Sequence, residues 1–200
     1  TCFSFYATKT LSTGEGGMLT TNSKVYAKSS KINRLHGIDR DAWDRYSDNG
    51  DWYYEVVDSG YKYNMTDIQA GLGLCQLDKL EAMNLKREKV SEIYLKGLRH
   101  LPLIFLQSEK ASRGSNHLFV IKTQNRDELY RFLKENGIQT SVHFIPIHKH
   151  PYYKKTFKYQ NRMYPVANDV FNSSLSLPIY PDMKIDEQNY IIDKIKLFFS

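Results

Sequence analysis

The sequence predicts a mixed α/β chain made of two structural units that a long helix connects. Three observations support this fold class. Short β-prone runs flank a glycine-rich turn near the start of the chain, at residues 2–6 and 16–21. A capped, charged helical segment follows in the middle, and strand, helix and strand patterns begin at residue 117. The composition, with 41% hydrophobic and 25% charged residues in 200, is typical of a globular chain that buries a core.

The first unit begins with the predicted strand pair and continues with a helix. Residues 24–35 carry apolar side chains on one side, and Ser23 is suited to cap the start of this helix. Residues 36–59 contain large aromatic and polar side chains without a sustained period, so we predict a long irregular loop. A loop of that length in a compact domain is usually functional.

The linking helix is predicted from a capping box. The hydroxyl of Thr66 can accept from the amide three residues on, and Gln69 can reach back to the cap amide. We assign the linking helix to residues 80–100. This assignment divides the chain into a first unit at residues 1–79 and a small C-terminal α/β domain at residues 101–200.

The second unit is predicted from periodicity and helix boundary signals. Its expected elements are, in order, a strand at 117–122, a helix at 127–136 closed by Gly137, a strand at 138–142, a helix at 166–172 and a final helix from Asp186, as N-cap, to Phe199.

The charge of the chain indicates which binding partners suit it, and its cysteine content indicates the redox state of its compartment. The net charge of +6 would suit an anionic partner such as a phosphate-bearing ligand or nucleic acid. Basic residues are dispersed among acidic ones, and no aromatic-basic repeat marks a groove, which argues against nucleic acid. Cys2 and Cys75 are too few for a disulfide framework and favour a reducing, cytoplasmic setting.

Two further features concern the membrane and the start of the chain. No apolar run approaches the roughly 20 residues that cross a bilayer, so we expect no membrane span. The chain opens on Thr1 and a strand-like apolar run that is typical of the inside of a domain. We therefore expect these residues to be part of a longer protein.

The strongest chemical signal is the segment from Phe3 to Gly17. Lys9 follows the end of the first predicted strand and precedes a Gly-Glu-Gly-Gly turn. This pattern places an amine at a sheet edge, beside backbone that a ligand can approach closely. From the residues alone, a solvated lysine next to a hairpin remains an alternative.

This segment resembles the DegT/StrS-type sugar aminotransferases, which are pyridoxal 5'-phosphate (PLP) enzymes of the aspartate-aminotransferase fold (fold type I). The resemblance implies the C-terminal part of such a transferase, with a small α/β C-terminal domain. It implies that Lys9 is the catalytic lysine that carries PLP and that Ser4 helps to hold the PLP phosphate. A dehydrating relative has histidine in place of this lysine, so Lys9 favours transamination.

A second part of the chain extends the resemblance. His36-Gly37, the run Asp-Ala-Trp-Asp-Arg at 41–45 and the segment 60–70 resemble the branch that aminates C4 of nucleotide-linked keto sugars. In the family, an asparagine in the last segment reaches the PLP phosphate of the neighbouring subunit. Here Lys62 stands at that position, and Asn64 follows two residues later. The resemblance therefore implies that Lys62 or Asn64 contacts the cofactor phosphate, and Lys62 would do so as a point charge. That both merely cap the helix entry remains an alternative.

The third segment is the histidine-rich run at 143–148. It resembles the family's His-aromatic-x-Pro-x-His segment, which borders the sugar site, and so implies substrate contacts from His143, Phe144 and His148. Taken alone, the histidines of this region could suggest a metal site. Prolines interrupt any helical ligand face and no cysteine or acidic residue lies in the cluster, so we expect no metal.

The resemblance implies transamination of a nucleotide-linked 4-keto sugar, with UDP as the expected nucleotide, in surface polysaccharide biosynthesis. Glutamate would donate the amino group and leave as 2-oxoglutarate, in a homodimer with shared active sites. In the family an acidic residue, a stacking aromatic and a phosphate loop lie N-terminal to the lysine motif, outside these residues. The alternative is therefore an incomplete fragment that acts only as a folded oligomerisation or PLP-binding unit.

Overall fold

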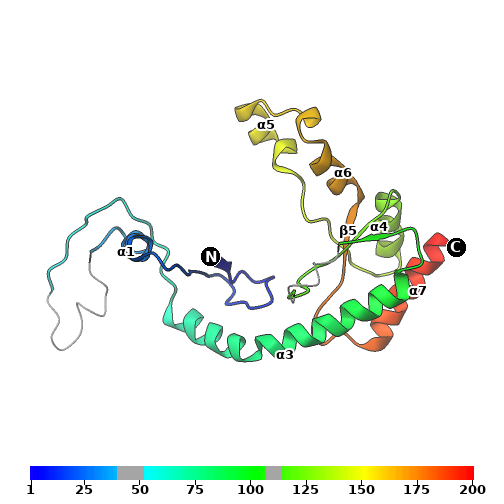
Figure 1. Ribbon diagram of the computed structural model, residues 1–200, viewed down its shortest axis with the longest axis horizontal. Helices are drawn as coiled ribbons and strands as arrows, with labels where there is room; N and C mark the ends of the chain where they lie inside the picture. Colours follow the sequence, from blue (N-terminus) through cyan, green and yellow to red (C-terminus); the bar gives the residue numbers. More distant parts are fainter. Residues whose placement is uncertain (40–51, 107–113) are drawn as a thin grey trace. The chain divides into compact units, whose positions relative to one another are not determined.

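The computed structural model describes residues 1–39, 52–106 and 114–200. It divides into two compact units, Thr1–Leu80 and Glu81–Ser200. Both contain helices and strands, so the predicted mixed α/β class is confirmed (Figure 1). Within the described residues, no helix combines the length and apolar character that a membrane span requires.

Unit 1 (Thr1–Leu80) starts with an antiparallel strand pair, β1 (Cys2–Ser4) and β2 (Gly17–Leu19), as predicted. The turn between them is tightly packed. The Thr13 hydroxyl donates to the Glu15 carbonyl at 2.6 Å. A Cβ on Gly16 would lie 2.6 Å from the Thr13 hydroxyl, so the turn requires glycine at this position.

The helix α1 (Lys24–Asn33) follows, and the Ser23 hydroxyl accepts from the Tyr26 amide at 3.4 Å, which confirms the predicted cap. Beyond the helix, Gly37 adopts φ +70° and packs directly against Gly60. The two ends of the predicted loop are therefore joined. Residues 40–51 lie outside the described part of the chain.

The helix α3 (Asp67–Leu98) spans the boundary between the units. Its predicted capping box is confirmed. The Gln69 amide donates to the Thr66 hydroxyl at 3.3 Å, and the Thr66 amide donates to Gln69 Oε1 at 3.1 Å. Gln69 Nε2 also donates to the Glu15 carbonyl at 3.1 Å, which ties the start of α3 to the glycine turn.

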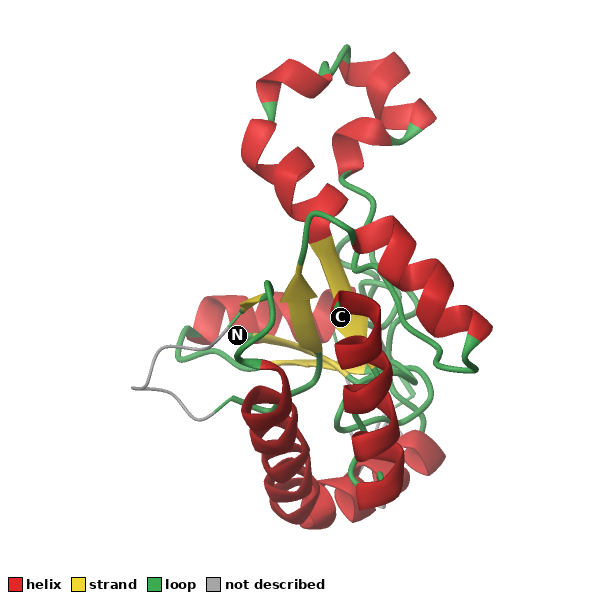
Figure 2. Cartoon of the chain, turned by 90° about the vertical axis from the view of Figure 1, so that its right-hand side faces the viewer, coloured by secondary structure: helices red, strands yellow, loops and turns green. Residues whose placement is uncertain are grey.

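Unit 2 (Glu81–Ser200) contains a three-stranded antiparallel sheet in the order β3 (Ile104–Phe105), β4 (Phe119–Lys122), β5 (Ser174–Leu177). Two helices, α4 (Arg126–Glu135) and α7 (Ile185–Phe199), pack against each other beside this sheet (Figure 2). The hydrophobic core of the described chain lies in this unit, and it includes Tyr94, Leu98, Ile121, Leu129, Leu133, Leu175 and Ile195.

Two predictions for unit 2 are wrong. Residues 138–142 form no strand and make only a single bridge, from Ser141 to Ser176. β4 pairs with β3 on one side and with β5 on the other, and both leucines of β5 are buried in the core. The N-cap of the last helix is Lys184, two residues before the predicted Asp186, because the Lys184 amide donates to the Glu187 carboxylate at 2.7 Å and Asp186 lies in the first turn.

Residues 147–173, here called the arm, extend away from the sheet in both views (Figures 1 and 2). The sequence predicted α6 but not α5 or the short 3-10 helices. The arm consists of η1 (Ile147–Lys149), α5 (Pro151–Phe157), η2 (Asn161–Met163) and α6 (Pro165–Ser173).

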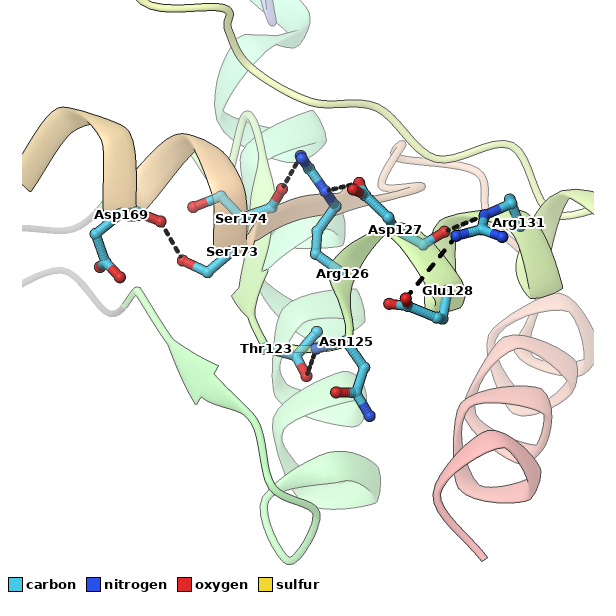
Figure 3. Close-up of polar contacts among 9 residues, drawn as sticks. All are labelled: Thr123, Asn125, Arg126, Asp127, Glu128, Arg131, Asp169, Ser173 and Ser174. Carbon is cyan, nitrogen blue, oxygen red and sulfur yellow. Dashed lines mark hydrogen bonds and ion pairs between the residues drawn. The ribbon is translucent and has the colours of Figure 1, made fainter. Parts of the chain in front are cut away.

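The root of the arm is fixed by a buried arginine, shown in Figure 3. Arg126 is 6% exposed, and it donates to the Ser174 carbonyl at 3.4 Å and to the Asp127 carboxylate at 2.6 Å. On α6, Asp169 forms an ion pair with Lys122 of β4 at 2.9 Å. Charged contacts therefore hold the end of α6 against the sheet.

Candidate functional site

Lys9 lies at the rim of a cavity of about 540 Å³ that is formed by unit 1 alone. A turn closed by the hydrogen bond from the Lys9 amide to the Tyr6 carbonyl, at 2.9 Å, carries the lysine to this rim. The side chain is exposed, and its amine has no hydrogen-bond or ion-pair partner among the described residues. The amine is therefore available to a ligand.

Ser4 borders the same cavity, at the end of β1. Its hydroxyl accepts from the Tyr6 amide at 3.4 Å, and its Cα is paired with Gly17. The structure thus brings together the two residues, Ser4 and Lys9, that the first motif singles out. The remaining wall is largely apolar, and it includes Phe3, Phe5, Leu11, Met18, Leu74 and Leu77.

Lys62 and Asn64 also belong to unit 1, but they do not line this cavity. They contact each other, because the Lys62 amine donates to Asn64 Oδ1. Lys62 is flanked by Tyr61 and Tyr63, whose rings stack with centroids 4.9 Å apart. The exposed Lys62 amine and both rings therefore face outward from the segment that precedes α3. The motif at 41–45 falls outside the described residues.

His143 and Phe144 lie in unit 2, shortly after Ser141, which forms the single bridge to Ser176. The half-buried His143 ring places Nδ1 2.9 Å from the Ser176 hydroxyl, which orients the ring from β5. Phe144 packs edge-on against His143 with centroids 4.7 Å apart, and it is 76% exposed. This pair presents an oriented imidazole and an accessible aromatic side chain.

His148 differs from His143 in its surroundings. It is 5% exposed, its Nε2 lies 3.0 Å from Asn168 Oδ1, and its ring stacks on Tyr164 at 4.7 Å. Asn168 in turn donates to the Asn161 carbonyl at 2.6 Å. His148 therefore cross-links η1, η2 and α6 inside the arm and leaves little surface for a substrate.

The sequence analysis missed one residue of this region, Ser176. The Ser-Leu-Ser-Leu alternation of β5 is a strand signal that places this serine on the side opposite the core, towards His143. In the described part of the chain, no group of three or more histidine, cysteine, aspartate or glutamate residues is arranged to hold a metal ion.

Comparison with known proteins identifies the chain's relatives. Residues 1–196 match the DegT/DnrJ/EryC1/StrS aminotransferase family. The uncharacterized protein MJ1066 of Methanocaldococcus jannaschii is 46% identical over 207 residues, covering 100% of this chain and 54% of MJ1066. SpsC, a spore coat polysaccharide biosynthesis protein of Bacillus subtilis, is 45% identical over 204 residues, covering 98% of this chain and 52% of SpsC. The chain therefore spans about half the length of the curated relatives it matches.

Solved structures show the same fold. The putative sugar aminotransferase Spr1654 from Streptococcus pneumoniae, in its PMP form, has a TM-score of 0.87 at 29% identity, over 98% of this chain and 52% of Spr1654. PseC, an aminotransferase of pseudaminic acid biosynthesis in Helicobacter pylori, has a TM-score of 0.87 at 26% identity, over 99% of this chain and 52% of PseC. The chain matches the C-terminal half of such sugar aminotransferases, as predicted. A PLP form of Spr1654 is also known. The chain belongs to the DegT/DnrJ/EryC1/StrS family of PLP-dependent aminotransferases.

Proposed function

We propose that this chain contributes the catalytic lysine, Lys9, to an enzyme that transfers an amino group from glutamate to a nucleotide-linked 4-keto sugar. One observation carries the proposal. In a member of this aminotransferase family, Ser4 and Lys9 line the same cavity, and the Lys9 amine has no partner among the residues that the structure describes. The alternative is that the chain serves only as a folded oligomerisation or PLP-binding unit, in which the Lys9 amine would at most hold PLP and would transfer no proton.

The residues of the cavity fit PLP. A lysine amine can bind its aldehyde carbon, a hydroxyl can donate to its phosphate, and apolar side chains such as Phe3 and Met18 can pack against its ring. Gly16 and Gly17 keep the backbone of the turn close, since a Cβ on Gly17 would lie 2.9 Å from the Phe3 carbonyl. When bound, PLP supplies an electron-withdrawing ring that stabilises negative charge at the adjacent carbon.

Lys9 would have two roles in this reaction. Its Nζ would hold the cofactor at rest, and once released it would move a proton between the substrate carbon and the cofactor carbon. Both roles need an amine that no carboxylate neutralises or restrains. The exposed and unpaired state of Lys9 in the described chain supports this requirement.

The sugar substrate is assigned to the second unit. His143, oriented by Ser176, can hydrogen-bond a sugar hydroxyl, and Phe144 can pack against a sugar ring. His148, also predicted to contact the substrate, is 5% exposed and cross-links the arm, so we assign it a smaller part in substrate binding than His143. The relatives named for spore coat polysaccharide and pseudaminic acid biosynthesis support a role in surface polysaccharide synthesis, with UDP as the proposed nucleotide.

The assembly proposed for the enzyme is a cytoplasmic homodimer. Lys62 and Asn64 do not line the Lys9 cavity of their own chain, which supports their reaching the cofactor phosphate of a partner subunit. Residues 1–79 would then be part of a large PLP-binding domain, residues 80–100 a linking helix and residues 101–200 a small domain. The free cysteines Cys2 and Cys75 support a reducing compartment.

The test is made on the complete protein, with ¹⁵N-glutamate, PLP and UDP-linked 4-keto sugars. We expect ¹⁵N in the sugar product by mass spectrometry, and its loss in Lys9→Ala. The matched control is Lys28→Ala, an exposed lysine on α1, which should keep the activity. Transfer that persists in Lys9→Ala would contradict the proposal, and a PLP-bound protein that transfers no nitrogen would support the binding-unit alternative.

A further inference from the structure

The basic excess of the chain is concentrated in the arm, in contrast to the dispersed charge expected from composition. No acidic residue occurs between Glu135 and Asp169. Over the same stretch, the arm carries basic side chains at Lys149, Lys154, Lys155, Lys158 and Arg162. A positively charged surface without neighbouring carboxylates attracts anions more strongly than the mixed surface around it.

These cations are available to a ligand. Lys154, Lys155, Lys158 and Arg162 are exposed, and none of them forms an ion pair within the described ranges. Lys149 is placed differently, because its amine lies 4.7 Å from the centroid of the Phe171 ring. This contact fixes Lys149 at the base of the arm without neutralising its charge.

The arm also carries a chain of ring contacts. Tyr153 stacks on Phe157 with centroids 6.1 Å apart, and Phe157 stacks on Tyr159 at 5.4 Å. Tyr159 meets Tyr164 edge-on at 5.6 Å, and Tyr164 stacks on the buried His148. The ladder is thus anchored inside the arm, which makes the basic surface a preformed one rather than a flexible tail.

Tyr152 stands apart from this ladder. It is 67% exposed, and its one ring contact among the described residues is a T-shaped contact with Tyr153, with centroids 5.2 Å apart. One face of an aromatic ring beside free lysines suits a planar base, because bases stack on aromatic side chains while lysine and arginine bind phosphate. A neutral sugar or an acidic peptide would use only part of this surface.

We propose that the arm binds the nucleoside diphosphate of the sugar substrate, with Lys154, Lys155 and Lys158 on the phosphates and Tyr152 against the base. This inference rests on the proposed function and assigns the nucleotide part of that substrate. It agrees with the order of the chain, since His143, assigned to the sugar, is followed directly by the arm. The phosphates are attached to the sugar, so a phosphate-binding surface is needed beside the sugar-binding residues.

The experiment measures UDP binding to this chain without PLP, by titration calorimetry and by ¹⁵N NMR. We expect the double variant Lys154→Glu/Lys155→Glu to weaken UDP binding by about tenfold or more, because two attractive charges become repulsive. The control is Lys28→Glu/Lys31→Glu on α1, which makes the same change in net charge in unit 1 and should alter affinity by less than about twofold. Equal losses in both variants would overturn the proposal.

Milder variants guard against misfolding of the arm. Lys154→Gln/Lys155→Gln should weaken UDP binding in the same direction, with a smaller dependence on salt than the original chain. Tyr152→Ala should weaken the binding of UDP more than the binding of pyrophosphate, whereas Tyr152→Phe should bind UDP as tightly as the original chain does. Tighter arm-dependent binding of RNA or of anionic lipid vesicles than of UDP would overturn the assignment to the substrate.

The two proposals fail in different assays. UDP binding is measured without the cofactor and without transamination, so its loss or retention reports on the arm alone. The ¹⁵N transfer and its loss in Lys9→Ala report on the proposed function. Arm-dependent UDP binding together with ¹⁵N transfer supports both, and ¹⁵N transfer without arm-dependent UDP binding rejects only the arm.

Discussion

The two units of the chain differ in where their apolar side chains lie. In unit 2, leucine, isoleucine and aromatic side chains from three helices and a sheet form a closed core. In unit 1 the described buried residues are Thr13 and Gly37, while apolar residues such as Ile68 and Leu74 are 86% and 67% exposed. Unit 2 therefore supplies most of the buried apolar packing of the chain, and unit 1 carries Lys9, the proposed PLP-binding lysine, on a surface that is poorly buried. Chemistry and stability are separated along the sequence.

The largest expected effect is a core substitution in unit 2. Leu133→Ala should lower the free energy of unfolding by about 2–5 kcal/mol, because the side chain is fully buried and leaves a cavity. Its counterpart in unit 1 is Leu74→Ala, at an exposed leucine, which should change it by less than about 0.5 kcal/mol. Urea denaturation followed by circular dichroism measures both. Similar losses would show that unit 1 also contributes to the core.

The second prediction concerns the glycine contact of unit 1. A Cβ on Gly60 would lie 2.0 Å from the Gly37 amide nitrogen, so Gly60→Ala must separate these segments at a cost of about 1–3 kcal/mol. Hydrogen exchange of the Val57 and Tyr61 amides should rise, because their hydrogen bonds join the same segments.

The control for Gly60→Ala is a glycine substitution that should stabilise the chain rather than destabilise it. Gly71 lies in α3 with open space around its Cβ position, so Gly71→Ala should stabilise the helix by about 0.5–1 kcal/mol. Faster exchange in both variants would show that the glycine contact is not what joins the segments.

The third prediction tests the polar group in the core of unit 2. Tyr94 donates to the Pro178 carbonyl at 2.9 Å, so Tyr94→Phe should cost about 1–2 kcal/mol of unfolding free energy. Burial raises the pKa of the Tyr94 phenol, with smaller contributions from Tyr180 and Glu187.

The neutral form of Tyr94 is therefore favoured in the folded chain. Its stabilisation is complete below the ordinary phenol pKa of about 10 and is lost as the pH rises above it. Between pH 8 and 11, the free energy of unfolding should fall more steeply with pH in the original chain than in Tyr94→Phe. Parallel curves would refute this assignment.

The smallest expected effect concerns the orientation of His143. Ser176→Ala removes its hydrogen-bond partner and should cost about 0.5–1 kcal/mol, with a change in the ¹⁵N shift of Nδ1. The neighbouring Ser174 hydroxyl is buried without a partner in the described chain, so Ser174→Ala should leave the His143 signal unchanged. A shifted His143 signal in both variants would indicate general disturbance of β5.

Elements with local signals were predictable from sequence. Ser23 and the pair Thr66 and Gln69 determine helix starts through contacts within three residues, and the structure contains both caps. The prediction of a strand at 138–142 was wrong because strand formation depends on pairing with distant residues. This segment makes only one such pairing, the isolated bridge between Ser141 and Ser176.

The candidate site was predictable to different extents. The Lys9 motif is contiguous, so its resemblance to a family could single out Lys9 and Ser4 from sequence, and both residues line one cavity in the structure. The burial of His148 depends on Asn168 and Tyr164, far along the chain, and no local pattern reveals it. The basic surface of the arm was hidden by the near-balanced composition of the whole chain.

The central claim is that Lys9 is the lysine that binds PLP. We would incubate the chain with PLP, reduce it with borohydride and map the modified peptides by mass spectrometry, with Lys9→Ala as control. The account predicts a label at Lys9 that disappears in the variant, because Lys9 lines the cavity and its amine has no partner in the described part of the chain. A label scattered over many lysines and unchanged in Lys9→Ala would contradict it.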